Sequence, residues 1–167
     1  MRLSTMSKKT LGMALAASTL VFSAPFAAAQ ANPRGEAKVT LGGKAVVIDY
    51  GRPSLRGRDM IAQLEVGKSW RMGADSATTL KTDADLTFGS LSVPKGSYVL
   101  TLTKAAADKW VLNVKAGDKT VADIPLLESK APAPVESLTI DLKGEKAAGE
   151  FQMSWGTLVV KAPFSAK

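Results

Sequence analysis

Apolar and polar residues alternate along most of the chain after residue 35, and this alternation limits the fold more than any other feature of the sequence. Successive side chains of a β-strand point to opposite faces, so a period of two predicts strands that bury one face and expose the other. Such strands are typical of antiparallel sheets. The pattern is clearest in residues 46–50, 98–103, 110–115, 138–143 and 151–155. The sequence therefore predicts an all-β protein with a single antiparallel β-sandwich or barrel-like domain.

Glycine, proline and aspartate separate these segments and indicate the turns between them. The pair Gly42-Gly43 suits a hairpin, and Trp155-Gly156 is also interpreted as a turn. Two stretches, 51–70 and 124–134, do not follow the alternation. We expect at most one short helix, between Asp59 and Leu64. We interpret the proline-containing residues 124–134 as a crossing connection.

The N-terminus has the features of a cleavable signal peptide. Basic residues are followed by an apolar run over residues 11–22 and by small residues that end at Ala29, which is the order that a signal peptidase recognises. The apolar run is shorter than the roughly 20 residues that span a bilayer. We expect cleavage after Ala29, although Ala31 also ends an A-x-A sequence. The sequence predicts a periplasmic or secreted protein with no integral membrane segment after cleavage.

The predicted organisation is a signal peptide over residues 1–29, a flexible segment over 30–35 and one β domain over 36–167. Removal of the signal peptide takes away three of the 22 basic residues and none of the 15 acidic ones, so the net charge falls from +7 to +4. This modest charge slightly favours contact with anionic envelope components. Scattered basic residues and export both argue against nucleic-acid binding.

The chain contains no cysteine and no histidine, and these absences exclude several kinds of site. A Ser-His-Asp or Cys-His nucleophilic site needs one of these residues. The usual zinc and transition-metal sites need them too. We therefore predict no catalytic residues, no metal and no cofactor, and we lean towards a protein that is not an enzyme.

Arginine is concentrated in one part of the sequence. Four of the five arginines that follow the signal peptide lie between Arg52 and Arg71. A guanidinium group pairs with carboxylate or phosphate through two parallel hydrogen bonds, so an anion-recognition loop is one interpretation. Internal ion pairs with nearby carboxylates are the other. The candidate ligand-binding residues are Arg52, Arg58, Trp70, Arg71 and Asp75.

Three functions follow from these residues. The leading hypothesis is a non-catalytic binding module that holds an anionic or carbohydrate-like envelope ligand, which makes the partner a small molecule or an envelope component. The first alternative is a hydrolase that acts on a glycan through paired carboxylates, with Asp49, Glu65 and Asp75 as candidates. The second is a structural envelope protein.

Short motifs along the chain match a known family. They are Gly42-Gly43-Lys44, VIDYGRPS at 47–54, Gly57-Arg58, Trp70-Arg71, Gly73-Ala74, Ala77-Thr78-Thr79, VPKGSY at 93–98, VESLTI at 135–140 and Trp155-Gly156. Together they resemble the bacterial family called domain of unknown function 2911, which usually has asparagine at the position of Asp75. The resemblance implies an exported β-rich domain, and it assigns no activity, ligand or catalytic residue.

Overall fold

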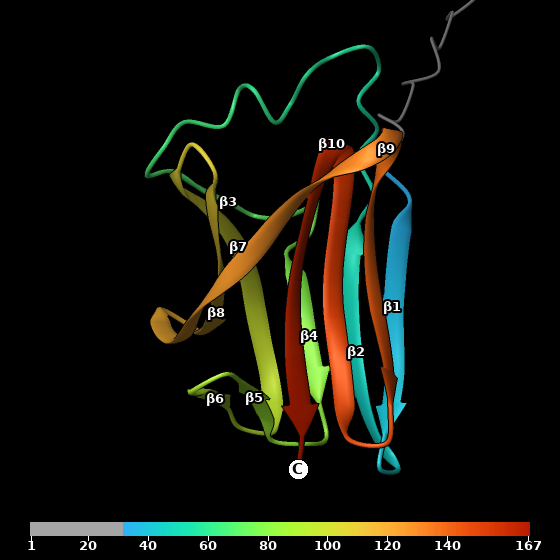
Figure 1. Cartoon of the computed structure of the whole chain (residues 1–167), viewed down its shortest axis with the longest axis vertical. Coiled ribbons are helices and arrows are strands. Elements are labelled where there is room, and N and C mark those ends of the chain that lie inside the picture. Colours follow the sequence, from blue (N-terminus) through green and yellow to red (C-terminus); the bar gives the residue numbers. More distant parts are fainter. Residues whose placement is uncertain (1–31) are drawn as a thin grey trace, which may run out of the picture. The chain divides into compact units, whose positions relative to one another are not determined.

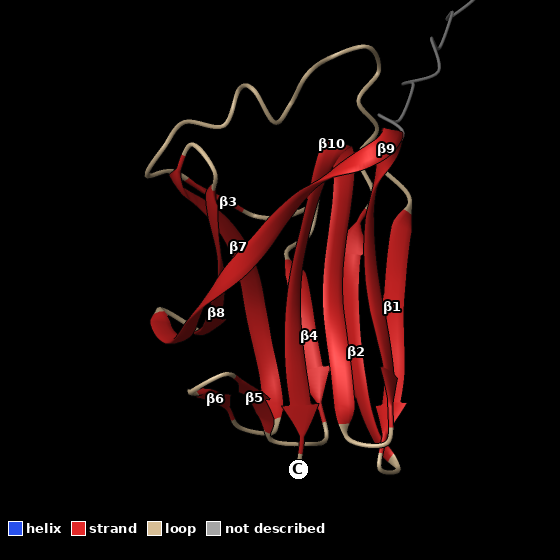
Figure 2. Cartoon of the chain, in the orientation of Figure 1, coloured by secondary structure: helices blue, strands red, loops and turns tan. Residues whose placement is uncertain are grey.

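The computed structural model describes residues 32–167, and the predicted signal peptide lies outside these residues. The described chain consists of strands, turns and loops and contains no helix (Figure 2). All strand pairs are antiparallel. The strands are β1 (Arg34–Leu41), β2 (Lys44–Gly51), β3 (Ser69–Trp70), β4 (Thr78–Thr82), β5 (Leu86–Phe88), β6 (Leu91–Val93), β7 (Gly96–Ala106), β8 (Lys109–Ala116), β9 (Lys119–Glu145) and β10 (Ala148–Ala166).

The strands form a sandwich-like arrangement that is joined through β9. The hydrogen-bonded order is β1-β2-β4-β7-β8-β9-β10-β5-β6, and β3 pairs with β7 beside this path. Figure 1 shows β9 running diagonally from the β7 and β8 side of the domain to the β10 side. The sheet does not close on itself, because no pairing joins β6 to β1 in the described chain. The predicted all-β, sandwich-like fold is confirmed.

The 27 residues of β9 correct one expectation. Its first part pairs with β8 as far as Leu126, and its second part pairs with β10 from Leu127 onwards. Residues 124–134 do cross from one layer to the other, but they do so as strand and not as a connection. Pro125 is exposed, and a proline that lacks an N–H group is tolerated at such a sheet edge.

The core lies between the inner faces of the two layers, as the alternation predicts. The largest fully buried side chains include Phe151, Leu100, Leu102, Ile124 and Ile140, each at most 2% exposed. Burying side chains of this size stabilises a fold by about 1.5–3 kcal/mol each. Besides tyrosine and tryptophan, only three polar side chains are buried in the described residues: Thr78, Thr82 and Ser154.

Residues between Asp59 and Leu64 form turns and no helix, which agrees with the expectation of at most one short helix. Two other local expectations differ from the structure. β1 begins at Arg34, inside the segment expected to be flexible, because Arg34 and Gly35 pair with Gly51 and Tyr50. Trp155-Gly156 is not a turn between strands but an irregularity inside β10, where Gly156 has a φ of 58° and the register with β9 shifts.

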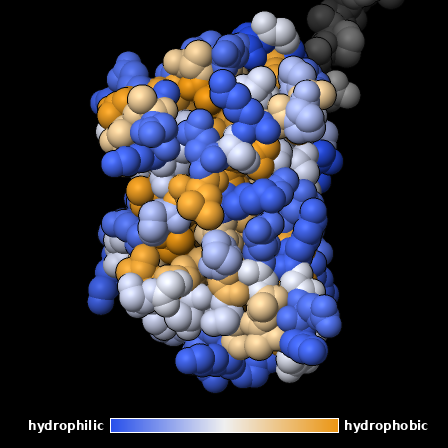
Figure 3. Space-filling view, viewed as in Figure 1, coloured by the Kyte–Doolittle hydropathy of each residue, from blue (hydrophilic) through white to orange (hydrophobic). Residues whose placement is uncertain are grey.

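The side of the domain where β5 approaches β9 is not fully covered. A cavity of about 140 Å³ lies there, lined by residues that include Phe88, Ile124 and Ala162. The view in Figure 3 shows apolar patches among polar ones on the face that carries the β9 crossing. Within residues 32–167, no helix is long and apolar enough to cross a membrane.

Candidate functional site

Arg52 helps to bind the end of β2 to the free edge of β9. Its backbone N–H donates to Pro33 O at 2.7 Å, its Nε donates to Leu138 O at 3.2 Å, and a terminal nitrogen donates to Thr139 Oγ1 at 3.3 Å. The Leu138 N–H in turn donates to Pro53 O at 3.0 Å. These bonds satisfy backbone groups that an unpaired strand edge would leave free. Arg52 therefore has a structural role.

The next residues continue this contact along β9. Ser54 forms an isolated antiparallel bridge with Ser137, and their hydroxyls lie 2.8 Å apart. The Leu55 N–H donates to Glu136 O at 2.9 Å. The Arg56 N–H donates to the Glu136 carboxylate, also at 2.9 Å. Residues 52–56 thus lie against β9 without forming a regular strand, which explains why the alternation stops at Gly51.

Arg71 and Asp75 belong to a tight loop that follows β3. A terminal nitrogen of Arg71 donates to the backbone oxygen of Asp75 at 2.8 Å. Asp75 has a φ of 61°, a left-handed conformation that aspartate tolerates better than most residues. Its carboxylate accepts from the Asn32 N–H at 2.8 Å. The contacts hold the loop in shape and use both polar groups of Asp75.

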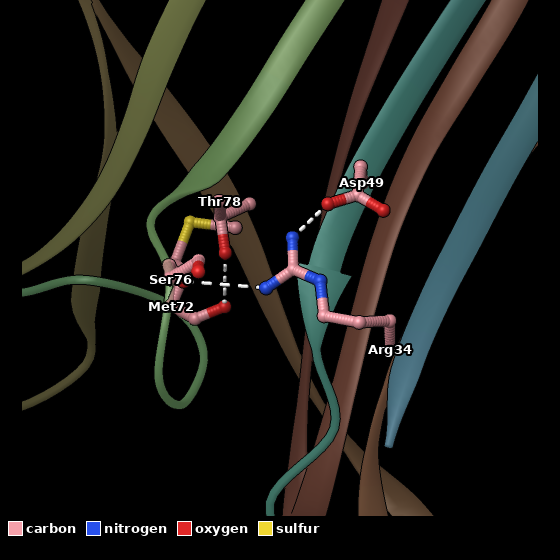
Figure 4. Close-up of polar contacts among 5 residues, drawn as sticks. All are labelled: Arg34, Asp49, Met72, Ser76 and Thr78. Carbon is pink, nitrogen blue, oxygen red and sulfur yellow. Dashed lines mark hydrogen bonds and ion pairs between the residues drawn. The ribbon is translucent and has the colours of Figure 1, made fainter. Parts of the chain in front are cut away.

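A second set of contacts fixes the same loop from the side of β1 and β2 (Figure 4). The Arg34 guanidinium forms an ion pair with Asp49 and also donates to Ser76 O at 3.3 Å. Met72 is fully buried with a φ of 52°, which is a strained conformation for this side chain. The buried Thr78 hydroxyl donates to Met72 O at 2.9 Å and holds the strained residue in place.

Trp70 packs against Trp155 of β10 across the two layers. Their ring centroids are 5.2 Å apart and the planes differ by 13°, which is a stacked pair. Trp155 is 3% exposed, and its Nε1 is buried with no hydrogen-bond partner among residues 32–167. A buried N–H without a partner costs about 1–3 kcal/mol. Trp70 is therefore part of the packing, whereas Trp155 retains an unused donor.

Arg58 is the only one of the five candidate residues that lines the cavity beside Gly156. This cavity has a volume of about 170 Å³ and is lined by Leu55, Arg58, Asp59, Pro134, Gly156 and Thr157. The Arg58 Nε donates to Leu55 O at 3.4 Å, which orients the guanidinium group. Its two terminal nitrogens have no hydrogen bond or ion pair within residues 32–167. This arginine is available to an anion.

The structure thus separates residues that the sequence grouped together. Arg71 and Asp75 are joined in one loop, Arg52 lies along β9, Trp70 packs on Trp155, and Arg58 lines a cavity. No sequence pattern pointed to Leu55, Pro134 or Thr157. Arg58 was a candidate ligand-binding residue, and Trp155-Gly156 was a family motif, but the sequence placed neither at a cavity.

The three carboxylates considered for hydrolysis do not form an open pair. Asp49 is paired with Arg34, and Asp75 accepts from Asn32. Neither of these two carboxylates lines the cavity beside Gly156, and Glu65 does not line it either. Within the described residues, no group of three or more carboxylates is arranged to hold a metal ion.

The fold and the cavity define a class: a single all-β, sandwich-like domain with a small, partly polar cavity at one end. The family described as protein of unknown function (DUF2911) matches residues 32–164, and the chain belongs to this family. The predicted membership is confirmed. No curated protein and no solved structure matches the chain.

Proposed function

We propose that this protein is an exported, non-catalytic binding module whose cavity beside Gly156 takes a small anionic ligand, with Arg58 as the anion-binding group. The observation that carries the proposal is the difference between Arg58 and its neighbours. Arg34, Arg52 and Arg71 each donate through terminal guanidinium nitrogens to acceptors of the protein. Within residues 32–167, the terminal nitrogens of Arg56 and Arg58 make no such bond, and of these two side chains only Arg58 lines the cavity.

The other lining groups favour an acidic sugar over a bare inorganic anion. The Asp59 carboxylate accepts from the Ala62 N–H at 3.0 Å through one oxygen, which leaves the other oxygen for a ligand hydroxyl. Thr157 adds a hydroxyl, whereas Leu55 and Pro134 add apolar surface. Sites of this kind combine apolar walls with a few convergent polar groups. A carboxylate held by Arg58 and a ring hydroxyl held by Asp59 use all of these features.

The volume of the cavity limits the size of the ligand that it can hold. Pockets for drug-sized molecules measure about 300–1,000 Å³, whereas this cavity measures about 170 Å³. One sugar ring, or the acidic end of a longer chain, is therefore the appropriate size. The Arg58 guanidinium and the ligand carboxylate would form two parallel hydrogen bonds.

The proposed location outside the cytoplasm rests on the sequence at the N-terminus. The basic, apolar and small-residue segments before residue 30 have the order of a signal peptide. An exported protein with a cavity for an acidic sugar would meet such groups in envelope polymers. Binding to the envelope is the role that combines both features.

The proposal is tested by ligand-induced stabilisation of residues 30–167. Glucuronate and inorganic phosphate are the anionic probes, and glucose is the uncharged match for glucuronate. A probe at ten times its Kd stabilises the fold by about 1.4 kcal/mol. We expect this stabilisation with glucuronate, a smaller effect with phosphate and none with glucose, together with a change in tryptophan fluorescence.

Two variants locate the binding. Arg58→Gln removes the anion-binding group from the cavity and should abolish the glucuronate effect while leaving the melting temperature of the free protein unchanged. Arg56→Gln is the matched control, because Arg56 is exposed, lies two residues away and does not line the cavity. Equal loss of binding in both variants, or glucuronate binding that survives Arg58→Gln, would overturn the proposal.

A further inference from the structure

The carboxylate of Asp75 is directed at the backbone nitrogen of Asn32. The Asn32 N–H donates to Asp75 Oδ2 at 2.8 Å, and the Asn32 side-chain amide lies 3.4 Å from the same oxygen. Arg71 donates to the backbone oxygen of Asp75 and makes no ion pair with its carboxylate. Within residues 32–167, this carboxylate therefore has neutral donors but no cationic partner.

The backbone around Asn32 is held in place by contacts of the next two residues, Pro33 and Arg34. Pro33 O accepts from the Arg52 N–H at 2.7 Å, and β1 begins at the next residue, Arg34. Arg34 in turn pairs with Asp49 and donates to Ser76 O, one residue after Asp75. The nitrogen of residue 32 thus has a fixed position beside the carboxylate, which is the geometry that an ion pair requires.

The sequence supplies a way to make that nitrogen a cation. Residues 29–31 read Ala-Gln-Ala, and small residues at the first and third positions before the cut are what a signal peptidase recognises. Cleavage after Ala29 would leave the nitrogen of Asn32 as a neutral amide. Cleavage after Ala31 would make it the α-amino group of the mature chain, which is protonated at neutral pH.

We propose that signal peptidase cuts between Ala31 and Asn32, and that the new α-ammonium group of Asn32 forms an ion pair with Asp75. The inference rests on the proposed export. Hydrolysis breaks the Ala31–Asn32 amide bond; water supplies the hydroxyl of the Ala31 carboxyl group and a hydrogen to the Asn32 amine, which then takes up a proton. Asp75 then binds the new N-terminus of the chain. This ion pair strengthens the contact between the residues before β1 and the loop after β3.

The first experiment determines the N-terminus. The full chain, residues 1–167, is expressed in a bacterium with a general secretory pathway, recovered from the envelope fraction and analysed by N-terminal sequencing and intact mass. We expect a chain that starts at Asn32. A chain that starts at Gln30 would overturn this inference and leave export intact. A chain that keeps residues 1–29 would overturn the proposed export, whereas failure of glucuronate binding bears only on the cavity.

The second experiment tests the ion pair by comparing the melting temperatures of four proteins. Asp75→Asn is introduced into the processed protein and into a matched protein with Gly-Ser placed before Asn32, where the nitrogen is an amide. An exposed ion pair adds only a small stabilisation, so we expect Asp75→Asn to lower the melting temperature by about 1–4 °C more in the processed protein. Equal shifts in the two backgrounds would overturn the ion pair even if the chain starts at Asn32.

Discussion

The side-chain hydroxyl of Tyr50 is bonded to both backbone groups of Ile140, which lies 90 positions later in the sequence. It accepts from the Ile140 N–H at 2.9 Å and donates to Ile140 O at 3.3 Å. Tyr50 is 3% exposed, so both backbone groups are satisfied where water does not reach them. Together with Arg52 and Pro53, this hydroxyl covers the edge of β9 that pairs with no strand of residues 32–167.

Tyr50→Phe should therefore destabilise the protein more than the loss of one ordinary hydrogen bond. The variant leaves a buried N–H and a buried C=O of Ile140 unpaired, and we expect a loss of about 2–3 kcal/mol in the free energy of unfolding, measured with urea. Tyr98→Phe is the control, because its hydroxyl makes one exposed bond, to Pro94 O. We expect about 1 kcal/mol or less there. Equal losses would contradict the role assigned to Tyr50.

Gly51 allows the end of β2 to touch the loop that contains Asp75. A Cβ atom at Gly51 would lie 2.1 Å from Ala74 O, so one of the two backbones would have to move. We expect Gly51→Ala to cost about 2–3 kcal/mol in urea unfolding. Gly117→Ala is the comparison: its φ is 60° but nothing lies within 4 Å. That variant should cost only about 1 kcal/mol, and a larger cost at Gly117 than at Gly51 would rule out the steric explanation.

Trp155 and Trp110 should respond differently to replacement by phenylalanine. Both are buried, but Trp110 Nε1 donates to the Glu128 carboxylate at 2.6 Å, whereas Trp155 Nε1 has no partner among the described residues. Phenylalanine removes a useful bond at Trp110 and an unsatisfied donor at Trp155. We expect Trp155→Phe to be less destabilising by about 1–2 kcal/mol. A larger loss of stability at Trp155 would indicate that its Nε1 donates a hydrogen bond to a water or a ligand.

The Arg34–Asp49 ion pair should by itself contribute little to the free energy of unfolding. The two side chains are 36% and 47% exposed, and exposed pairs contribute about 0.2–1 kcal/mol. A double-mutant cycle with Arg34→Ala and Asp49→Ala should give a coupling energy in that range, weakened by added salt. Arg34→Ala alone should cost more than Asp49→Ala, because Arg34 also donates to Ser76 O. The reverse order would argue against the loop-anchoring role of Arg34.

Much of the fold was predictable because the signals are local. Alternation identified the strands that contain Tyr50, Leu100, Leu112, Ile140 and Met153, and the pair Gly42-Gly43 identified the β1–β2 hairpin. The course of β9 was not predictable. Prolines usually interrupt a central strand. In β9, Pro125 pairs with Val111 next to the last pair with β8, whereas Pro132 and Pro134 lie between Lys130 and Val135, where the register with β10 shifts.

The candidate site also has features that the sequence predicts and features that it does not. The sequence by itself determined an all-β domain, its family and the concentration of arginine between Arg52 and Arg71. Only the tertiary structure decided that Arg52 covers the edge of β9, that Arg71 fixes its own loop and that Arg58 faces a cavity. The physical reason is that strand formation depends on the period of neighbouring side chains, whereas the role of an arginine depends on its acceptor. For Arg52 that acceptor lies 86 residues away.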